Sequence, residues 1–98
     1  MMTGTEGTPE SVEDNLLKRR FEMATPLGIA FLDYRLEGQT LYLIHAEVPR
    51  AARGQGIGGR LTSSVLESAR ARGLKVVPMC GYVAAFMAGN PQYADLRA

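Results

Sequence analysis

The sequence predicts a small α/β domain built on a mixed sheet of about four strands, in the order β-β-β-α-β-α. Short runs rich in β-branched, aromatic and apolar residues come before residue 49, as is typical of an antiparallel meander. A glycine-rich turn over residues 53–59 then leads into a stretch with helical periodicity. The apolar run after that helix is expected to pair in parallel with the strand before it, because a helix joins the two.

Composition indicates one domain and excludes several classes of protein. The chain has 98 residues, of which 46% are hydrophobic, and this suffices for one small core. Its formal net charge is +1 and no block of Lys or Arg occurs, so nucleic acid is not expected as a partner. No apolar run approaches the ~20 residues of a membrane span, so a membrane is not expected as a partner either.

The beginning of the chain is predicted to be a flexible tail. Residues 1–14 combine Gly, Thr, Pro and acidic residues without apolar periodicity and without the apolar core of a signal peptide. We therefore predict a tail over residues 1–14 and a folded domain over 15–98. The one cysteine excludes an internal disulfide, and a reducing, cytoplasmic setting is the expectation. No metal site is predicted.

Three strands are expected before the glycine-rich turn. Residues 15–24 alternate in part and predict the first strand, and residues 29–36 and 40–48 predict the second and third. Pro49 cannot donate to a ladder and is expected to end the third strand. The glycine-rich turn then follows the end of this strand.

Two helices and one strand are expected after the turn. Residues 60–72 predict an amphipathic helix that Gly73 ends. Residues 74–79 predict a short buried strand, and residues 82–88 predict a second helix. The apolar stripe of the first helix consists of Ile57, Leu61, Val65, Leu66 and Ala69.

The glycine-rich turn is the strongest functional signal in the sequence. Four glycines stand between Arg53 and Arg60, where they leave backbone N–H groups uncovered at a helix start and favour an anion. We expect this anion to be a phosphate. A dinucleotide-binding fingerprint does not fit, because three strands precede the turn and residues 73–79 contain no acidic residue. A Walker loop does not fit, because no Gly-Lys-Ser/Thr follows.

The spacing Arg53-x-x-Gly56-x-Gly58 resembles the acetyl-coenzyme A pyrophosphate loop of the GNAT superfamily of N-acetyltransferases. Residues 45–49, 77–82 and 90–93 resemble motifs of its compact, single-domain branch, and the resemblance covers roughly residues 16–96. It implies the acyl-CoA N-acyltransferase fold, acetyl-CoA as cofactor and donor, and direct transfer to an amine acceptor, either a small molecule or a protein. The cofactor-binding residues that it implies are Val48, Arg53, Gly54, Gln55, Gly56, Ile57, Gly58 and Gly59.

His45 and Glu47 are the candidate general bases. They lie two residues apart on a predicted strand and so share one face, and either residue type can take a proton from an ammonium acceptor. The alternative is a hydrogen-bonded structural histidine beside a surface carboxylate.

Cys80 is the third candidate catalytic residue. It stands at the end of the last predicted strand and before a helix start, a position at which a thiol can be reactive. It could equally be a small core residue. Tyr82 and Tyr93 could protonate the leaving thiolate, or simply pack at the edge of the core.

Two departures from larger members of the superfamily leave other functions open. Where those members carry an Asn and, about seven residues later, a Tyr acid, this chain has Cys80 and then Phe86 or Met87. The short connection between the first strands implies an open acceptor site or one that a partner completes. A non-catalytic module that binds CoA or acyl-CoA is therefore the alternative function, and an interaction domain with a merely structural turn is a third.

Overall fold

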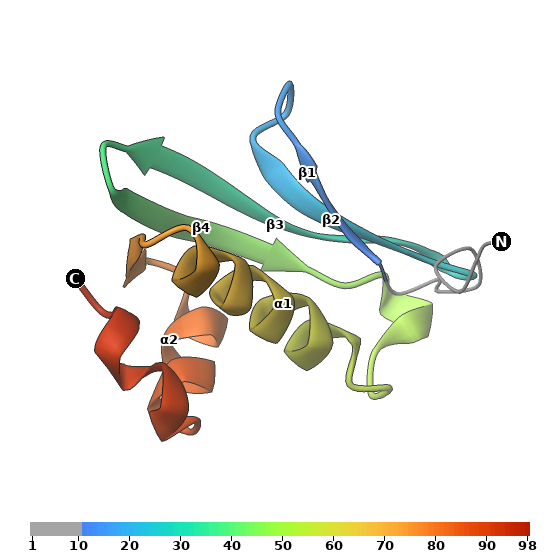
Figure 1. Ribbon diagram of the computed structural model, residues 1–98. Coiled ribbons are helices and arrows are strands. Elements are labelled where there is room, and N and C mark those ends of the chain that lie inside the picture. Colours follow the sequence, from blue (N-terminus) through green and yellow to red (C-terminus); the bar gives the residue numbers. More distant parts are fainter. Residues whose placement is uncertain (1–10) are drawn as a thin grey trace, which may run out of the picture.

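The protein folds around a mixed five-stranded sheet, which positions the glycine-rich turn at one end of a strand (Figure 1). The structure is a computed structural model that describes residues 11–98. The strands follow one another across the sheet in chain order; the first four are antiparallel, and the last is parallel to its neighbour. They are β1 (Val12–Asn15), β2 (Arg20–Thr25), β3 (Gly28–Glu37), β4 (Thr40–Glu47) and β5 (Lys75–Pro78).

All the helical segments lie on one side of this sheet (Figure 1). Helix α1 (Ile57–Ala71) joins β4 to β5, and α2 (Gly81–Ala88) follows β5. Two 3₁₀ segments, Arg50–Ala52 and Pro91–Leu96, precede α1 and follow α2. The predicted α/β class, mixed sheet and parallel last strand are confirmed. No helix within the described residues is long and apolar enough to cross a membrane.

The prediction of a single first strand over residues 15–24 is wrong. The segment is a hairpin in which residues 16–19 connect β1 to β2. Asn15 Oδ1 accepts a hydrogen bond from the Lys18 N–H at 3.1 Å, and Arg19 adopts a φ of 54° that closes the turn. Leu16 and Leu17 are 73% and 97% exposed, so the apolar pattern there does not reflect burial.

The hairpin also moves the start of the folded domain. The predicted tail reached Asp14, whereas residues 12–14 belong to β1 and pair with residues 21–23 of β2. The remainder of the predicted tail, residues 1–10, lies outside the described residues. The sheet consequently has five strands instead of the four expected.

The core lies between the sheet and its helices. Every residue of the predicted α1 stripe is buried, and α1 begins at Ile57, three residues earlier than predicted. In β2, β3 and the first half of β4, alternate residues face the helices. These buried side chains and the apolar stripe of α1 form one layer. The largest fully buried side chains of the sheet are Met23, Leu32, Leu41, Leu43 and Val76.

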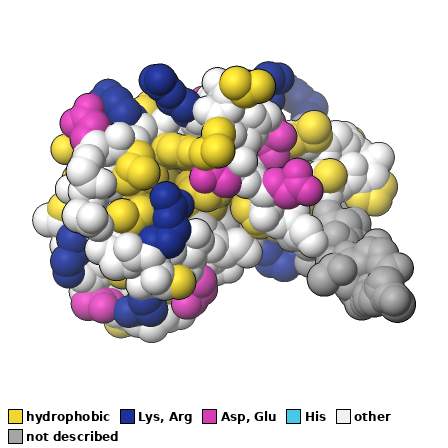
Figure 2. Space-filling model, turned by 45° about the horizontal axis from the view of Figure 1, so that its top comes forward, with side chains coloured by type: hydrophobic (Ala, Val, Ile, Leu, Met, Phe, Trp, Pro, Cys, Tyr) yellow, Lys and Arg dark blue, Asp and Glu magenta, His cyan; other side chains and the backbone are white. Residues whose placement is uncertain are grey.

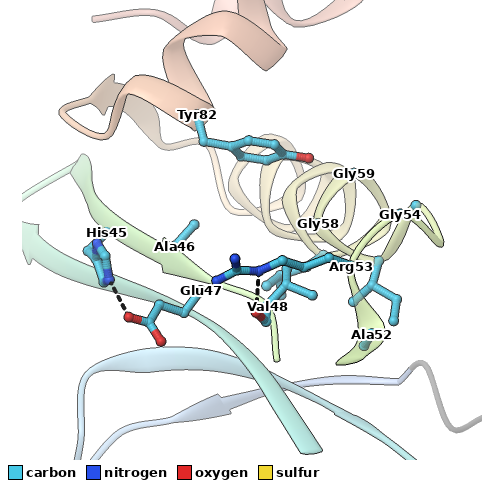
Figure 3. Close-up of a pocket in the computed structure, with 13 residues that line it drawn as sticks. His45, Ala46, Glu47, Val48, Ala52, Arg53, Gly54, Gly58, Gly59 and Tyr82 are labelled. Atoms are coloured by element: carbon cyan, nitrogen blue, oxygen red, sulfur yellow. Dashed lines mark hydrogen bonds and ion pairs between the residues drawn. The ribbon is translucent and has the colours of Figure 1, made fainter. Parts of the chain in front are cut away.

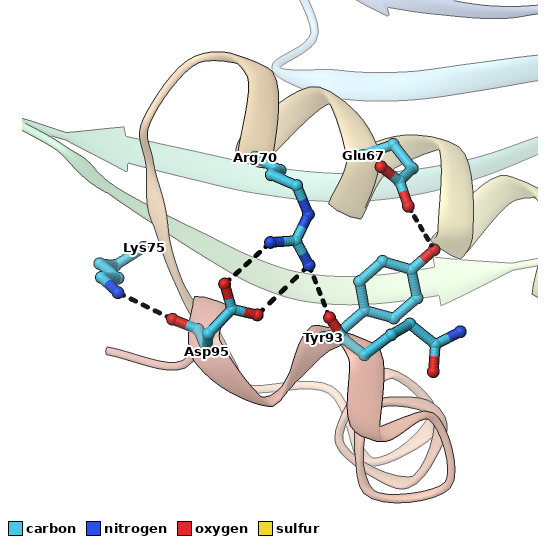
Figure 4. Close-up of polar contacts among 6 residues, drawn as sticks. Glu67, Arg70, Lys75, Tyr93 and Asp95 are labelled. Atoms are coloured by element: carbon cyan, nitrogen blue, oxygen red, sulfur yellow. Dashed lines mark hydrogen bonds and ion pairs between the residues drawn. The ribbon is translucent and has the colours of Figure 1, made fainter.

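A polar network fixes the end of the chain against α1 and β5 (Figure 4). Arg70 donates to both carboxylate oxygens of Asp95, at 2.8 and 3.2 Å, and to the Gln92 carbonyl at 2.6 Å. The Arg70 hydrogen bonds hold the pKa of Asp95 below its usual value. The buried Tyr93 donates its hydroxyl to Glu67 at 2.9 Å. The Tyr93 hydroxyl is therefore part of this structural network.

Tyr34 ties β1 to the rest of the sheet, and its loss gives a first prediction. Its hydroxyl donates to Asp14 Oδ1 at 2.6 Å, and burial, followed by this hydrogen bond, raises its pKa to about 12. We expect Tyr34→Phe to lower the free energy of unfolding by about 1.5–3 kcal/mol in urea denaturation, as for other hydrogen bonds to charged groups. Tyr42→Phe, the control, should lose much less free energy of unfolding. An equal loss in the two variants would contradict a stabilising hydrogen bond between Tyr34 and Asp14.

The same shift sets a pH dependence at the alkaline end. Because the folded state favours the neutral phenol of Tyr34, its contribution to stability is complete below the ordinary tyrosine pKa of 10.0. It is lost as the pH rises from there to about 12. Wild type and Tyr34→Phe should therefore converge in stability over this interval.

Candidate active site

Strands β4 and β5 separate halfway along β4, and this opens a backbone edge. Only Thr40–Leu43 of β4 pairs with β5. The N–H groups of Met79 and Cys80 both donate to the Leu43 carbonyl, at 2.9 and 3.1 Å, and the chain then turns into α2. In the described part of the chain, residues 44–47 therefore have a strand neighbour on one side only, namely β3.

A β-bulge at the same place turns the candidate bases away from the core. Leu43 lies opposite Tyr34 and His45 opposite Asp33, so Ile44 is the extra residue. Before the bulge Leu43 faces the core, and after it Ala46 and Val48 pack there. His45 and Glu47 consequently project from the face that carries no helix.

His45 and Glu47 form a pair, as their spacing on one face predicts. His45 Nε2 and Glu47 Oε2 are 3.2 Å apart, and the two side chains are 53% and 56% exposed (Figure 3). A carboxylate at this distance can orient the imidazole, and either group can accept a proton from an approaching amine. The two side chains therefore act as one candidate base.

The glycine-rich turn shapes a helix start that can accept an anion. Gly54 and Gly56 have φ of 83° and 75°, the left-handed region that side chains disfavour. Gly56 is the N-cap of α1; no side chain caps this helix, and its first turn has no acidic residue. The first N–H groups of a helix lack acceptors within the helix. They are therefore available to an anion, which the helix dipole also favours.

Two arginines brace the turn. Arg60 Nη1 donates to the Gln55 carbonyl at 3.0 Å. Arg53 Nε donates to the Val48 carbonyl at 3.2 Å, which leaves its terminal nitrogens facing the cavity between the turn and β4 (Figure 3). Arg53 thus adds positive charge between the glycine-rich turn and the end of β4 (Figure 3).

One cavity of about 440 Å³ joins the two features. The His45–Glu47 pair lies at one end and the glycine-rich turn at the other (Figure 3). This volume is within the range of about 300–1,000 Å³ common for ligand pockets. The cavity is lined by His45, Ala46, Glu47, Val48, Ala52, Arg53, Gly54, Gly56, Ile57, Gly58, Gly59, Leu61 and Tyr82.

All but two of the predicted site residues line this cavity. The exceptions are Gln55, whose carbonyl is held by Arg60, and Cys80, which is half-buried against the core at the N-cap of α2. Sequence reasoning did not assign Ala52 and Leu61 to the site, since neither carries a chemical signal beyond its apolar character. Of the two tyrosines considered as acids, the structure brings only Tyr82 to the cavity.

Comparison with known proteins identifies the family. A family model described as GCN5-related N-acetyl-transferase matches residues 20–96. The chain therefore belongs to the GCN5-related N-acetyltransferase family, as the turn and its flanking motifs predict. A GCN5-like protein from Staphylococcus aureus, whose structure was solved by NMR, has the same fold with a TM-score of 0.72. The two are 21% identical, and the match covers 93% of this chain and 90% of the other.

Proposed function

We propose that this protein transfers an acetyl group from acetyl-CoA directly to an amine acceptor. The observation that carries the proposal is one cavity that runs from the uncapped start of α1 to an exposed His–Glu pair. A phosphate group and a base would thus lie at opposite ends of one space. A donor of elongated shape, with a diphosphate at one end and a reactive thioester at the other, matches this arrangement.

The residues present fit acetyl-CoA along its length. The N–H groups at the start of α1 and the Arg53 guanidinium would hold the diphosphate. The open edge of β4 over residues 44–47 offers backbone N–H and C=O groups in the spacing of a strand, which suits the amides of the pantetheine arm. The cofactor would therefore occupy the place of a strand beside β4.

The His45–Glu47 pair would supply the proton chemistry. Acetyl-CoA, when bound, would supply an acetyl thioester, whose C–S bond is exchanged for a C–N bond to the acceptor. The pair would take a proton from the acceptor ammonium, so that the neutral nitrogen can attack. The nitrogen would lose a second proton as the amide forms, and this would balance the proton that the leaving thiolate takes up. Because both side chains project from the face without helices, the acceptor would approach from that face.

The charges on the face seen in Figure 2 do not select one kind of amine. Figure 2 shows exposed apolar side chains among basic and acidic ones, so that no single charge dominates the visible face. A small molecule or a protein amine is therefore consistent with the charge distribution. The short connection expected between the first two predicted strands is the turn between β2 and β3, and the connection between β1 and β2 has four residues. Neither connection contains a helix, which supports an open acceptor side.

Binding and acceptor assays test the proposal in turn. Coenzyme A or acetyl-CoA at a hundredfold excess over its dissociation constant should stabilise the protein by ~2.7 kcal/mol in thermal unfolding. NADH serves as the comparison ligand. A rise in the unfolding temperature with NADH but not with coenzyme A or acetyl-CoA would refute the proposal. Binding of CoA without turnover in a broad screen of amines would favour the alternative, a non-catalytic CoA-binding module, for which the lack of a Tyr at position 86 or 87 argues.

Cys80 gives a prediction of its own. Its position outside the cavity lining supports packing over service as an acetyl carrier. We expect Cys80→Ala to lower stability slightly and to keep its rate of transfer. Intact-protein mass spectrometry of the wild type after incubation with acetyl-CoA should show no acetyl group on Cys80. A Cys80 adduct that forms and decays as fast as turnover would contradict this expectation.

A further inference from the structure

Tyr82 lies over the first turn of α1. It projects from the first turn of α2, and a Cβ atom added at Gly58 would stand 2.8 Å from the Tyr82 hydroxyl oxygen and 3.1 Å from its Cζ. In Figure 3 the hydroxyl points toward the end of the cavity at Gly58 and Gly59, away from His45 and Glu47. The phenol therefore belongs to the phosphate end of the cavity and not to its reactive end.

The hydroxyl of Tyr82 is available to a ligand. Tyr34 and Tyr93 each donate to a carboxylate, whereas the Tyr82 hydroxyl makes no hydrogen bond to any of residues 11–98. The side chain lines the cavity and is 48% exposed. A phenol donor next to uncapped helical N–H groups adds one more donor to an anion site.

We propose that Tyr82 is a cofactor-binding residue that donates its phenolic O–H to the diphosphate of CoA at the start of α1. This inference rests on the proposed function and assigns Tyr82 a role other than acid for the leaving thiolate. It also separates the roles of the glycines. Gly54 and Gly56 provide positive φ, whereas Gly58 leaves the space that the Tyr82 hydroxyl occupies.

Calorimetric titration with CoA and with desulfo-CoA, which lacks the thiol, tests the assignment. Tyr82→Phe should weaken binding of both ligands about tenfold, near the lower limit for a hydrogen bond to a charged group. Tyr42→Phe, which removes a hydroxyl outside the cavity, should bind both as the wild type does. A loss confined to CoA would place the hydroxyl at the thiol and overturn the proposal.

The remaining outcomes separate this inference from the function on which it rests. Equal affinity of wild type and Tyr82→Phe for CoA would refute the role of Tyr82 alone. A wild-type protein that binds neither ligand would refute the proposed function and, with it, the role of Tyr82. The variant is expected to fold, since the side chain is half-exposed and its hydroxyl has no protein partner within the described residues.

A second variant tests the geometry without removing the hydroxyl. Gly58→Ala should displace the exposed Tyr82 ring and weaken CoA binding. The same change made in a Tyr82→Ala background should weaken it much less, because the ring is already absent. Additive losses of affinity in the two backgrounds would show that Gly58 and Tyr82 act independently and would overturn the proposed division of roles.

Discussion

Gly56→Val should abolish measurable CoA binding in a protein that still folds. Gly56 has a φ of 75°, and a β-branched side chain is disfavoured there by at least the 1–2 kcal/mol estimated for residues other than glycine. The added methyl groups would also cover the N–H groups at the start of α1 and press on Arg60, whose Nη1 atom lies 3.3 Å from the position of the new Cβ. Strain and obstruction therefore act together at this residue.

A second glycine separates the two effects. Gly38, in the turn between β3 and β4, has a φ of 60° and no atom within 4 Å of an added Cβ. Gly38→Val should lose stability to a similar extent and keep its affinity for CoA. Thermal unfolding followed by circular dichroism, together with calorimetric titration, measures both quantities. Wild-type affinity in folded Gly56→Val would show that the turn does not bind the cofactor.

Glu47→Gln should lower the rate of acetyl transfer by about 10²–10⁴, the range typical of general acid–base catalysis. The amide keeps the shape of the side chain but cannot take a proton from the acceptor. Affinity for CoA should change little, because the N–H groups at the start of α1 lie at the other end of the cavity from Glu47. The measurement compares kcat and the CoA dissociation constant with an acceptor found in the screen.

Matched variants show which residue of the His45–Glu47 pair accepts the proton. Glu37→Gln is the control, because its carboxylate on β3 is 58% exposed, close to the 56% of Glu47. If His45 and Glu47 act as one unit, His45→Gln should cost nearly as much as the double variant. Unchanged kcat in Glu47→Gln with a large loss in His45→Gln would assign the base to His45. Unchanged kcat in both would remove the pair from the mechanism.

Local patterns predicted most of the fold, and the exception has a physical reason. α1 and β3–β5 carry periodicities that burial enforces, and their ends stand at Gly and Pro residues that restrict the backbone. The β1–β2 hairpin was missed because Leu16 and Leu17 interrupt the polar turn with apolar side chains that nothing buries. The turn is closed by the Asn15 side chain and by Arg19 in the left-handed region. It contains neither Gly nor Pro, the residues by which the other turns are recognised in the sequence.

The sequence predicted which residue types make up the candidate site, but only part of their arrangement in space. The spacing of His45 and Glu47 places them on one face, yet strict alternation from Leu43 would point His45 into the core. A change of phase does mark the bulge, since core positions pass from odd numbers at Leu43 to even numbers at Ala46 and Val48. The contact of Tyr82 with Gly58 joins residues far apart in the chain, and no local pattern predicts it.

The four-residue connection between β1 and β2 also bears on how such a protein can diversify. Residues 16–19 do not line the cavity of about 440 Å³, and two of them are among the most exposed apolar side chains of residues 11–98. Exposed turns of this kind accept inserted segments readily. The connection over residues 16–19 and the residues that line the cavity are thus separate stretches of sequence. An insertion between β1 and β2 would lengthen that connection and leave the residues that line the cavity unchanged.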